Sequence, residues 1–232
     1  MPSVEPSHYT RRSFVYRRLV EAGAAFVEVD GSAVADAFPG QGGLPGRLAL
    51  IDLSPLPRYG YKGRGVMTWL AARGVAAPET NNRAHIADNG TLVARLADTE
   101  ALLLPGPATP GAVPETDPGP DARCYSVPRR DSHAWFMLTG RLARPCLEKL
   151  CGVDLRPDRF SDLSVAQTSV ARLTAILIRQ DLGGTPGFHL LADSASALYF
   201  WDVLTDAMKE FHGAPAGLRA LGTLGALARG AR

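Results

Sequence analysis

The stretch YKGRGVMTWLAARGVAAP, residues 61–78, decides the fold because the chain writes its pattern a second time. Residues 137–157 read MLTGRLARPCLEKLCGVDLRP. Both stretches contain Gly-Arg, place a Leu at the same distance from that Gly (Leu70 and Leu147), and then reach Gly-Val and a Pro. A glycine turn followed by apolar residues at helical spacing predicts a short helix in each copy. The sequence therefore predicts an internal duplication.

Strand patterns surround each copy and complete the repeated unit. Asn89-Gly90 is a strong signal for a two-residue hairpin in the first copy. In the second copy, residues 164–181 predict one long strand or two, and residues 188–193 predict a further strand. One unit of strand, turn, helix and hairpin is too small to bury both faces of its sheet. We expect two units packed about a pseudo-twofold axis as one α+β domain with antiparallel sheets.

The last predicted helix covers residues 195–211, with Ser194 as its expected cap. Its apolar residues recur at helical spacing and predict a core face; they are Trp201, Leu204, Met208 and Phe211. Asp202, Asp206 and Glu210 recur on another face. That acidic stripe is compatible with simple solvation or with the arginines of a partner.

Composition divides the chain into four parts. We expect residues 11–104 to form the first half of the duplicated domain and residues 124–213 the second. Residues 105–123, PGPATPGAVPETDPGPDAR, have the composition of an exposed Pro/Gly-rich linker. Residues 214–232 contain a leucine series broken by glycines, which predicts a flexible C-terminal tail or a segment that docks on a partner.

The overall composition is that of an ordinary globular protein. Of the 232 residues, 46% are hydrophobic and 21% are charged, and a net charge of +2 gives no electrostatic case for nucleic acid or an anionic membrane. No apolar run approaches the ~18 residues of a membrane span, and no targeting segment is recognisable. Three cysteines do not make a disulfide framework. These features predict a cytoplasmic protein.

Few residues suggest chemistry. Asp131-Ser132-His133 resembles a hydrolase trio, but neighbours in sequence point in different directions, and triad members normally come from separate elements. His189 lies in a predicted strand and is interpreted as a packed histidine. The histidines show no helical zinc pair, and the glycines fit no dinucleotide fingerprint. From these patterns we expect no catalytic, cofactor-binding or metal-binding residues in this chain.

Longer stretches carry a resemblance to a family. GLPGRLALIDLSPLPRYGYKG, with its Asp52-Leu53-Ser54 pattern ahead of Gly63, resembles the opening of aminomethyltransferase-type folate-binding proteins. WFMLTGRLARPCLEKLCGVDLRPDRF, AQTSVARLTAILIR and FHLLADSASALYFWDVLTDAMKEF resemble more closely the gamma subunits of heterotetrameric sarcosine oxidases and their relatives in N-methylglutamate dehydrogenase. The resemblance covers about residues 11–215 apart from the linker, and it implies the aminomethyltransferase-like fold.

The chain departs from the folate-dependent members of that family. The resemblance implies an acidic residue where the chain enters a strand ending in Arg, whereas the matching residues 171–179, ARLTAILIR, contain no carboxylate. An apolar or hydroxyl group cannot accept protons at neutral pH as a carboxylate can. Asp88 precedes the equivalent strand of the first copy, but Asp-Asn-Gly is also ordinary turn chemistry. The resemblance therefore implies a retained fold without the reaction.

This resemblance implies a non-catalytic gamma-type subunit of a flavin-dependent complex that oxidises N-methyl amino acids and feeds one-carbon units to tetrahydrofolate. FAD, FMN, NAD and tetrahydrofolate would then be bound by larger flavin-binding partner subunits. The alternative is a stand-alone folate-binding aminomethyltransferase-like protein, with Asp88 as its best acidic candidate. A third reading is an interaction module of some unrelated assembly.

Overall fold

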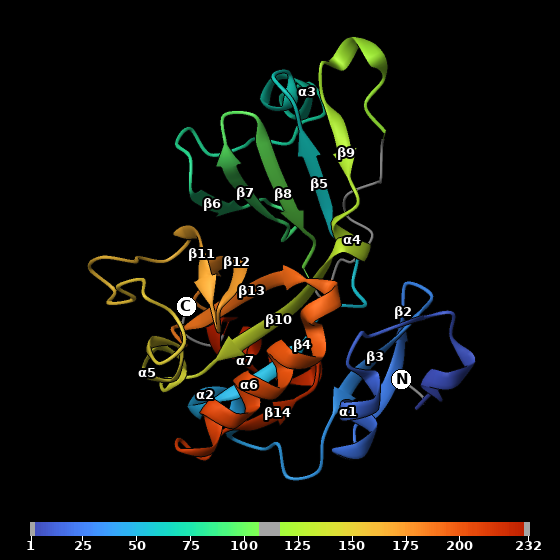
Figure 1. Cartoon of the computed structure of the whole chain (residues 1–232), viewed down its shortest axis with the longest axis vertical. Helices are drawn as coiled ribbons and strands as arrows, with labels where there is room; N and C mark the ends of the chain where they lie inside the picture. Colours follow the sequence, from blue (N-terminus) through green and yellow to red (C-terminus); the bar gives the residue numbers. More distant parts are fainter. Residues whose placement is uncertain (1–2, 107–116, 230–232) are drawn as a thin grey trace.

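The computed structural model describes residues 3–106 and 117–229 and places them in three sheets with short helices (Figure 1). The six-stranded sheet has the order β11 (Val165–Val170), β12 (Leu173–Arg179), β13 (Gly187–Asp193), β10 (His133–Thr139), β4 (Ala49–Asp52), β14 (Ala214–Ala216). The five-stranded sheet has the order β6 (Arg83–Ile86), β7 (Leu92–Ala97), β8 (Glu100–Leu104), β5 (Tyr59–Lys62), β9 (Tyr125–Val127). The three-stranded sheet has the order β1 (Arg11–Arg12), β3 (Ser32–Ala37), β2 (Ala25–Val29).

Among the described residues most helices are short, and two of them, α6 and α7, exceed two turns. The α-helices are α1 (Tyr16–Glu21), α2 (Leu44–Arg47), α3 (Val66–Ala71), α4 (Arg129–Ser132), α5 (Ala143–Glu148), α6 (Ala197–Lys209) and α7 (Arg219–Arg229). The 3₁₀ turns are η1 (Pro6–His8), η2 (Pro120–Ala122) and η3 (Ser194–Ser196). Within the described part of the chain, every helix is too short or too polar to cross a membrane.

The duplication predicted from the sequence is visible in the topology. The first unit runs β5, α3, β6, β7, β8, and its strands lie in the order β6-β7-β8-β5. The second unit runs β10, α5, β11, β12, β13, and its strands lie in the corresponding order β11-β12-β13-β10. Every strand pair within the two units is antiparallel. The predicted α+β class with a duplicated antiparallel unit is therefore confirmed.

The two turn glycines of the repeat have the same structural reason. Gly63 has φ +137° and Gly140 has φ +119°, which L side chains rarely adopt. A Cβ at Gly63 would lie 2.4 Å from the Arg123 carbonyl oxygen, and one at Gly140 would lie 2.4 Å from the Arg47 carbonyl carbon. Each unit thus turns from strand to helix at a point where only glycine fits.

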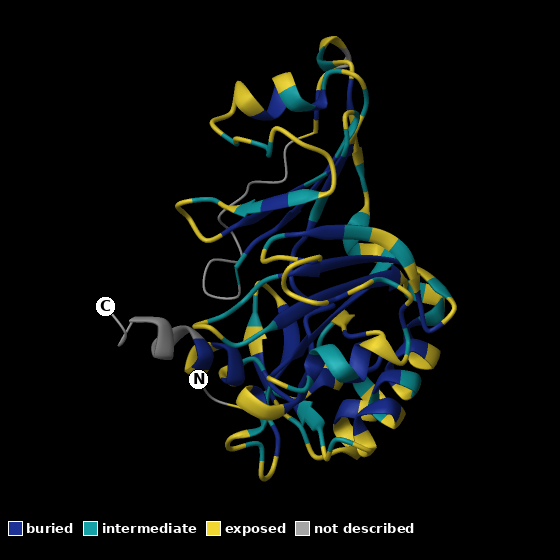
Figure 2. Cartoon of the chain, turned by 90° about the vertical axis from the view of Figure 1, so that its left-hand side faces the viewer, coloured by how far each residue is buried: buried dark blue, intermediate teal, exposed yellow. Residues whose placement is uncertain are grey.

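The sheets and helices stack in layers, and the buried residues follow those layers (Figures 1 and 2). One face of the six-stranded sheet packs against helices that include α1, α5 and α6; Trp201, predicted as core, is buried here. The other face packs against the five-stranded sheet and α7. The outer face of the five-stranded sheet is covered by α3. The two larger sheets therefore face each other across a shared apolar layer that α7 also enters.

Residues 164–181, which allowed one strand or two, form the hairpin β11–β12. Its turn, Ala171-Arg172, has positive φ at both positions (51° and 66°) without any glycine. Type I′ hairpin turns require this backbone conformation because its twist matches that of the paired strands. The sequence gives only a weak signal for a hairpin here, because alanine and arginine are unusual at the two central positions of a type I′ turn.

Two expectations for the C-terminal third are wrong. Ser194 does not cap the helix with its side chain; the Asp193 carboxylate accepts the Ala195 N–H and initiates η3, which leads into α6. The segment expected as a flexible tail instead forms β14, parallel to β4, and α7. Leu221 and Leu224 of α7 are buried in the core between the sheets. Apolar burial stabilises a helix whose glycines give it low intrinsic propensity.

The acidic stripe of α6 is used within the chain. Asp202 pairs with Arg18 at 3.0 Å, Asp206 pairs with Lys209 at 2.9 Å, and Glu210 pairs with Lys149. The linker expected at residues 105–123 lies partly outside the described residues, and the boundaries of the two halves, 11–104 and 124–213, stay predictions. One strand of the first half, β4, lies in the sheet of the second beside β10.

Candidate functional site: an apolar cavity between the sheets

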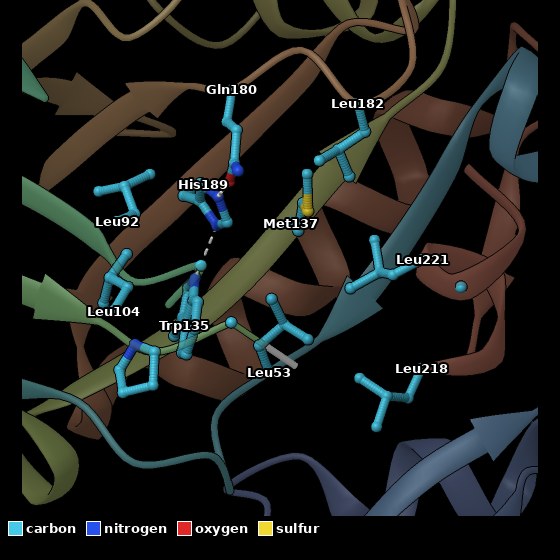
Figure 3. A pocket seen from close by; sticks show the side chains of 14 residues that line it. Leu53, Leu92, Leu104, Trp135, Met137, Gln180, Leu182, His189, Leu218 and Leu221 are labelled. Atoms are coloured by element: carbon cyan, nitrogen blue, oxygen red, sulfur yellow. Dashed lines mark hydrogen bonds between the residues drawn. The ribbon is translucent and has the colours of Figure 1, made fainter. Parts of the chain in front are cut away.

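A cavity of about 320 Å³ lies between the two larger sheets (Figure 3). Its walls come from the end of β4, the β7–β8 pair, strands β10 and β13, the β12–β13 turn and α7. The lining residues are Leu53, Gly90, Leu92, Leu104, Pro105, Gly106, Trp135, Met137, Gln180, Leu182, His189, Leu218, Leu221 and Gly222. Both repeated units and the C-terminal helix therefore build the cavity together.

Strand alternation explains which side chains face this cavity. On β10, Phe136 and Leu138 belong to the core beneath the sheet, whereas Trp135 and Met137 point to the opposite face. On β13, His189 is directly opposite Met137 in the antiparallel register. Cross-strand neighbours on one face lie within side-chain reach of each other. The register thus places an indole, a thioether and an imidazole side by side.

His189 is held by a short hydrogen-bonded chain. The Trp135 indole N–H donates to His189 Nδ1 at 3.0 Å, and His189 Nε2 lies 2.7 Å from Gln180 Oε1 (Figure 3). These partners fix a neutral imidazole with its proton on Nε2. Burial lowers the pKa of His189 to about 4. The imidazole is thus uncharged at neutral pH, and both of its nitrogens are engaged by protein groups.

The Asp52-Leu53-Ser54 pattern holds the cavity wall rather than a ligand. The Asp52 carboxylate accepts the backbone N–H of Ser54 at 3.0 Å, and Ser54 Oγ accepts the backbone N–H of Trp135 at 3.0 Å. The Leu53 N–H donates to the Trp135 carbonyl at 2.8 Å. Burial raises the pKa of Asp52. This turn joins the end of β4 to the start of β10 and fixes the backbone that carries Trp135.

Arg58, four residues after Ser54, also holds the turn after β4 against the start of β10. It is buried, and its guanidinium donates to five backbone carbonyl oxygens: those of Ser54, Leu56, Arg129, Arg130 and His133. A buried guanidinium with this many acceptors replaces its lost hydration by fixed dipoles. Arg58 therefore organises the loop after β4 and the segment that leads into β10.

The chemical content of the cavity is narrow. Among the described residues that line it, none carries a carboxylate, and the polar side-chain groups come from Trp135, Gln180 and His189. Apolar walls with a few polar groups are typical of small-molecule sites, whose volumes begin near ~300 Å³. A pterin brings several N–H donors that need acceptors, and the Gln180 oxygen already serves His189. Within the described lining, few side-chain acceptors are therefore left for such a ligand.

Of the residues singled out from the sequence, His189, Leu53 and Gly90 line the cavity, whereas Asp88, Thr174 and the Asp131-Ser132-His133 trio lie outside its lining. Asp88 is exposed in the turn between β6 and β7, where the Gly90 N–H donates to the Ala87 carbonyl at 2.8 Å. Thr174 is exposed on β12. The interpretation of His189 as a packed histidine is confirmed, although its position in a cavity was missed. The sequence did not point to Trp135, Met137 or Gln180 either. Alternation along β10 shows which side chains share a face, but only the pairing of β10 with β13 shows that this face lines a cavity.

The hydrolase trio does not assemble as a triad. Ser132 Oγ lies 2.8 Å from His133 Nδ1, but His133 Nε2 faces Arg129 Nη1 at 2.9 Å. Because an arginine can only donate, Nε2 accepts, and the proton sits on Nδ1, pointing at the serine oxygen. Asp131 turns away and pairs with Arg11 at 2.8 Å. Burial, with the neighbouring arginines, lowers the pKa of His133 to about 4.

Metal ligation finds no support in the described residues, where no three His, Cys, Asp or Glu side chains come together as a possible site. Cys124, Cys146 and Cys151 are buried free thiols, and burial raises the pKa of Cys146 to about 11. They are core residues, as the sequence indicated.

Two repeated strand–helix–hairpin units that enclose a central cavity define an aminomethyltransferase-like α+β domain. The chain matches the GCVT N-terminal domain over residues 15–226, and it belongs to that family. No curated protein matches the chain.

Two solved structures share the fold. A chain of the heterotetrameric sarcosine oxidase from Corynebacterium sp. U-96, in complex with pyrrole 2-carboxylate, is 23% identical with a TM-score of 0.61, over 87% of this chain and 96% of that one. The glycine cleavage system aminomethyltransferase T from Bartonella henselae is 15% identical with a TM-score of 0.67. That match covers 92% of this chain but 61% of the transferase, so this chain spans about three fifths of its length.

Proposed function

We propose that this chain is a non-catalytic, gamma-type subunit of a multi-subunit flavin-dependent oxidase or dehydrogenase of N-methyl amino acids, which feeds one-carbon units to tetrahydrofolate. The observation that carries the proposal is the cavity lining. Its one ionisable side chain among the described residues is His189, which is neutral and engaged at both nitrogens. Such a site has no group ready to accept or deliver a proton.

The comparison with the sarcosine oxidase supports the multi-subunit part of the proposal. The match extends over 96% of one chain of a heterotetramer, so a polypeptide of about this extent serves in that assembly as a separate chain. The proposed partners are larger flavin-binding subunits, and the proposed compartment is the cytoplasm. FAD, FMN, NAD and tetrahydrofolate would be held by those partners, while this chain contributes structure.

The alternative is a stand-alone folate-binding aminomethyltransferase-like protein. The cavity itself favours this reading, because it has the size of a small-molecule site and lies at the centre of the fold. The missing carboxylate in the described lining counts against it. Asp88 would have to supply the acid–base group, and it lies exposed on a hairpin turn.

The proposal predicts that Asp88→Asn and Thr174→Val leave the amine-dependent reduction of an electron acceptor nearly unchanged. Neither residue contributes to the transition state, so each rate should change by less than about threefold, under ~1 kcal/mol. The assay uses co-expressed, co-purified subunits and is normalised to assembled complex. A loss of a hundredfold or more in Asp88→Asn, with the complex intact, would reject the proposal and favour the folate enzyme.

A further inference from the structure

A second hollow, of about 310 Å³, lies beside the short edge strand β1 and shares no residue with the central cavity. It is lined by Thr10, Arg11, Arg12, Phe14, Ser54, Pro55, Arg130 and Asp131. A smaller hollow of about 140 Å³ shares three of these residues, Arg11, Arg130 and Asp131, and extends to Ser126 and Val127 of β9. The two hollows are therefore adjacent, and together they are called the groove below.

The groove carries more positive than negative charge. Asp131 is the acidic residue in its described lining, and it is already paired with Arg11 at 2.8 Å. Arg12 forms no ion pair with any described residue, and its guanidinium lies 4.8 Å from the centre of the Tyr16 ring. The groove therefore presents an arginine whose charge no described carboxylate neutralises.

Arg130 is held in place but is not fully satisfied. Its Nη2 donates to Ser32 Oγ and to the Pro55 carbonyl, each at 3.2 Å, and lies 3.5 Å from Asp30 Oδ2. Its Nε is buried and has no hydrogen-bond partner among the described residues. Buried polar groups without partners are uncommon in folded proteins. The Asp30 contact is an ion pair that balances part of the Arg130 charge, and the buried Nε is out of reach of a ligand. Arg130 is therefore held in place, and Nη1, which forms no hydrogen bond with a described residue, is the donor left for a ligand.

The shape and chemistry of the groove suit a protein chain. Arginine and aromatic residues are enriched at protein interfaces, and Phe14 is 37% exposed beside Arg12 and Pro55. A guanidinium recognises a carboxylate through two parallel hydrogen bonds. β1 lies at the edge of its sheet with both side chains exposed, and edge strands accept extended segments.

We propose that this groove binds an extended acidic segment of a partner protein, with its carboxylates on Arg12 and Arg130 and an apolar side chain against Phe14. The inference rests on the proposed function in taking the partner to be a larger subunit of the complex. The binding chemistry, however, is testable on the free chain.

The test uses a labelled six-residue peptide of alternating Glu and Val, and fluorescence anisotropy at low salt with the purified full chain. The wild-type chain should bind this peptide, and binding should weaken as salt is added because the contact is ionic. Arg12→Glu should reduce affinity at least fivefold. The matched control is Arg141→Glu, which reverses an exposed arginine that forms no ion pair among the described residues.

Comparison ligands complete the test. A peptide with Gln in place of Glu and the small dicarboxylate glutarate should both bind at least fivefold more weakly. Failure of the Glu peptide to bind, equal binding of the Gln peptide, equal binding of glutarate, or an equal loss in Arg141→Glu would each overturn the inference. None of these outcomes decides whether the chain assembles with flavin subunits, so the two proposals fail separately.

Discussion

At the scale of single residues, the histidine in the cavity, His189, is hydrogen-bonded to protein groups at both ring nitrogens. His189 receives the Trp135 indole N–H and faces Gln180, and burial lowers its pKa to about 4. An unfolded histidine binds a proton near its ordinary pKa of 6.5. Between pH 6.5 and 4 the unfolded chain therefore binds more protons than the folded chain, and stability falls as the pH falls.

This linkage predicts that stability is lost on acidification and that His189→Gln reduces the loss. The His189 contribution is roughly 3 kcal/mol when the full shift is crossed, and His133 adds to it over the same range because its pKa is also lowered to about 4. Urea unfolding at pH 7.5 and pH 4.5 measures the difference, with the exposed His8→Gln as control. Equal acid sensitivity in His189→Gln and the wild-type chain would contradict this account.

Some single-residue roles could be predicted from the sequence and others could not. The sequence Asp-Asn-Gly predicts a turn at Asp88, and Asp88 lies in a turn, because this tripeptide acts through local backbone geometry. The role of Arg58 could not be predicted, since its five carbonyl acceptors come partly from residues 129–133. A buried arginine in a loop gives no local signal of such distant partners.

At the scale of elements, the repeated glycine turn is a steric constraint that both units share. We expect Gly63→Ala and Gly140→Ala each to destabilise the chain by ~2 kcal/mol or more, because both need positive φ and a Cβ would meet backbone atoms at 2.4 Å. Gly152→Ala is the matched control: nothing lies within 4 Å of a Cβ there, and the change should stay within about 0.5 kcal/mol. Chemical denaturation provides the comparison. A cost at Gly140 no larger than at Gly152 would refute the steric argument.

The C-terminal helix α7 is an element that the sequence pattern did not predict. Gly222 and Gly225 within α7 lower its intrinsic helix propensity, so the sequence pattern favours a flexible tail. The helix is instead stabilised by burial of Ala220, Leu221 and Leu224 against the six-stranded sheet. That contact depends on the space between two sheets assembled from distant segments. The duplicated units were predictable because their turns, helices and hairpins are local; the docking of α7 was not.

At the scale of the whole molecule, the fold encloses a small-molecule-sized cavity but equips it with apolar side chains and a neutral histidine. Family membership follows from the match over residues 15–226, and the duplication explains how two small units build one core. The sequence indicated this architecture through its repeated pattern. It did not indicate the cavity, because the lining comes from segments as distant as Leu53 and Leu221.

The most direct test of the central claim is to purify the tagged full chain from its native cells and measure flavin absorbance and amine-dependent acceptor reduction in the same sample. The account predicts a stable complex with larger subunits at fixed stoichiometry, a flavin spectrum, and oxidation of an N-methyl amino acid. The contradictory result is a chain that purifies alone, without flavin, and by itself transfers a one-carbon unit to tetrahydrofolate.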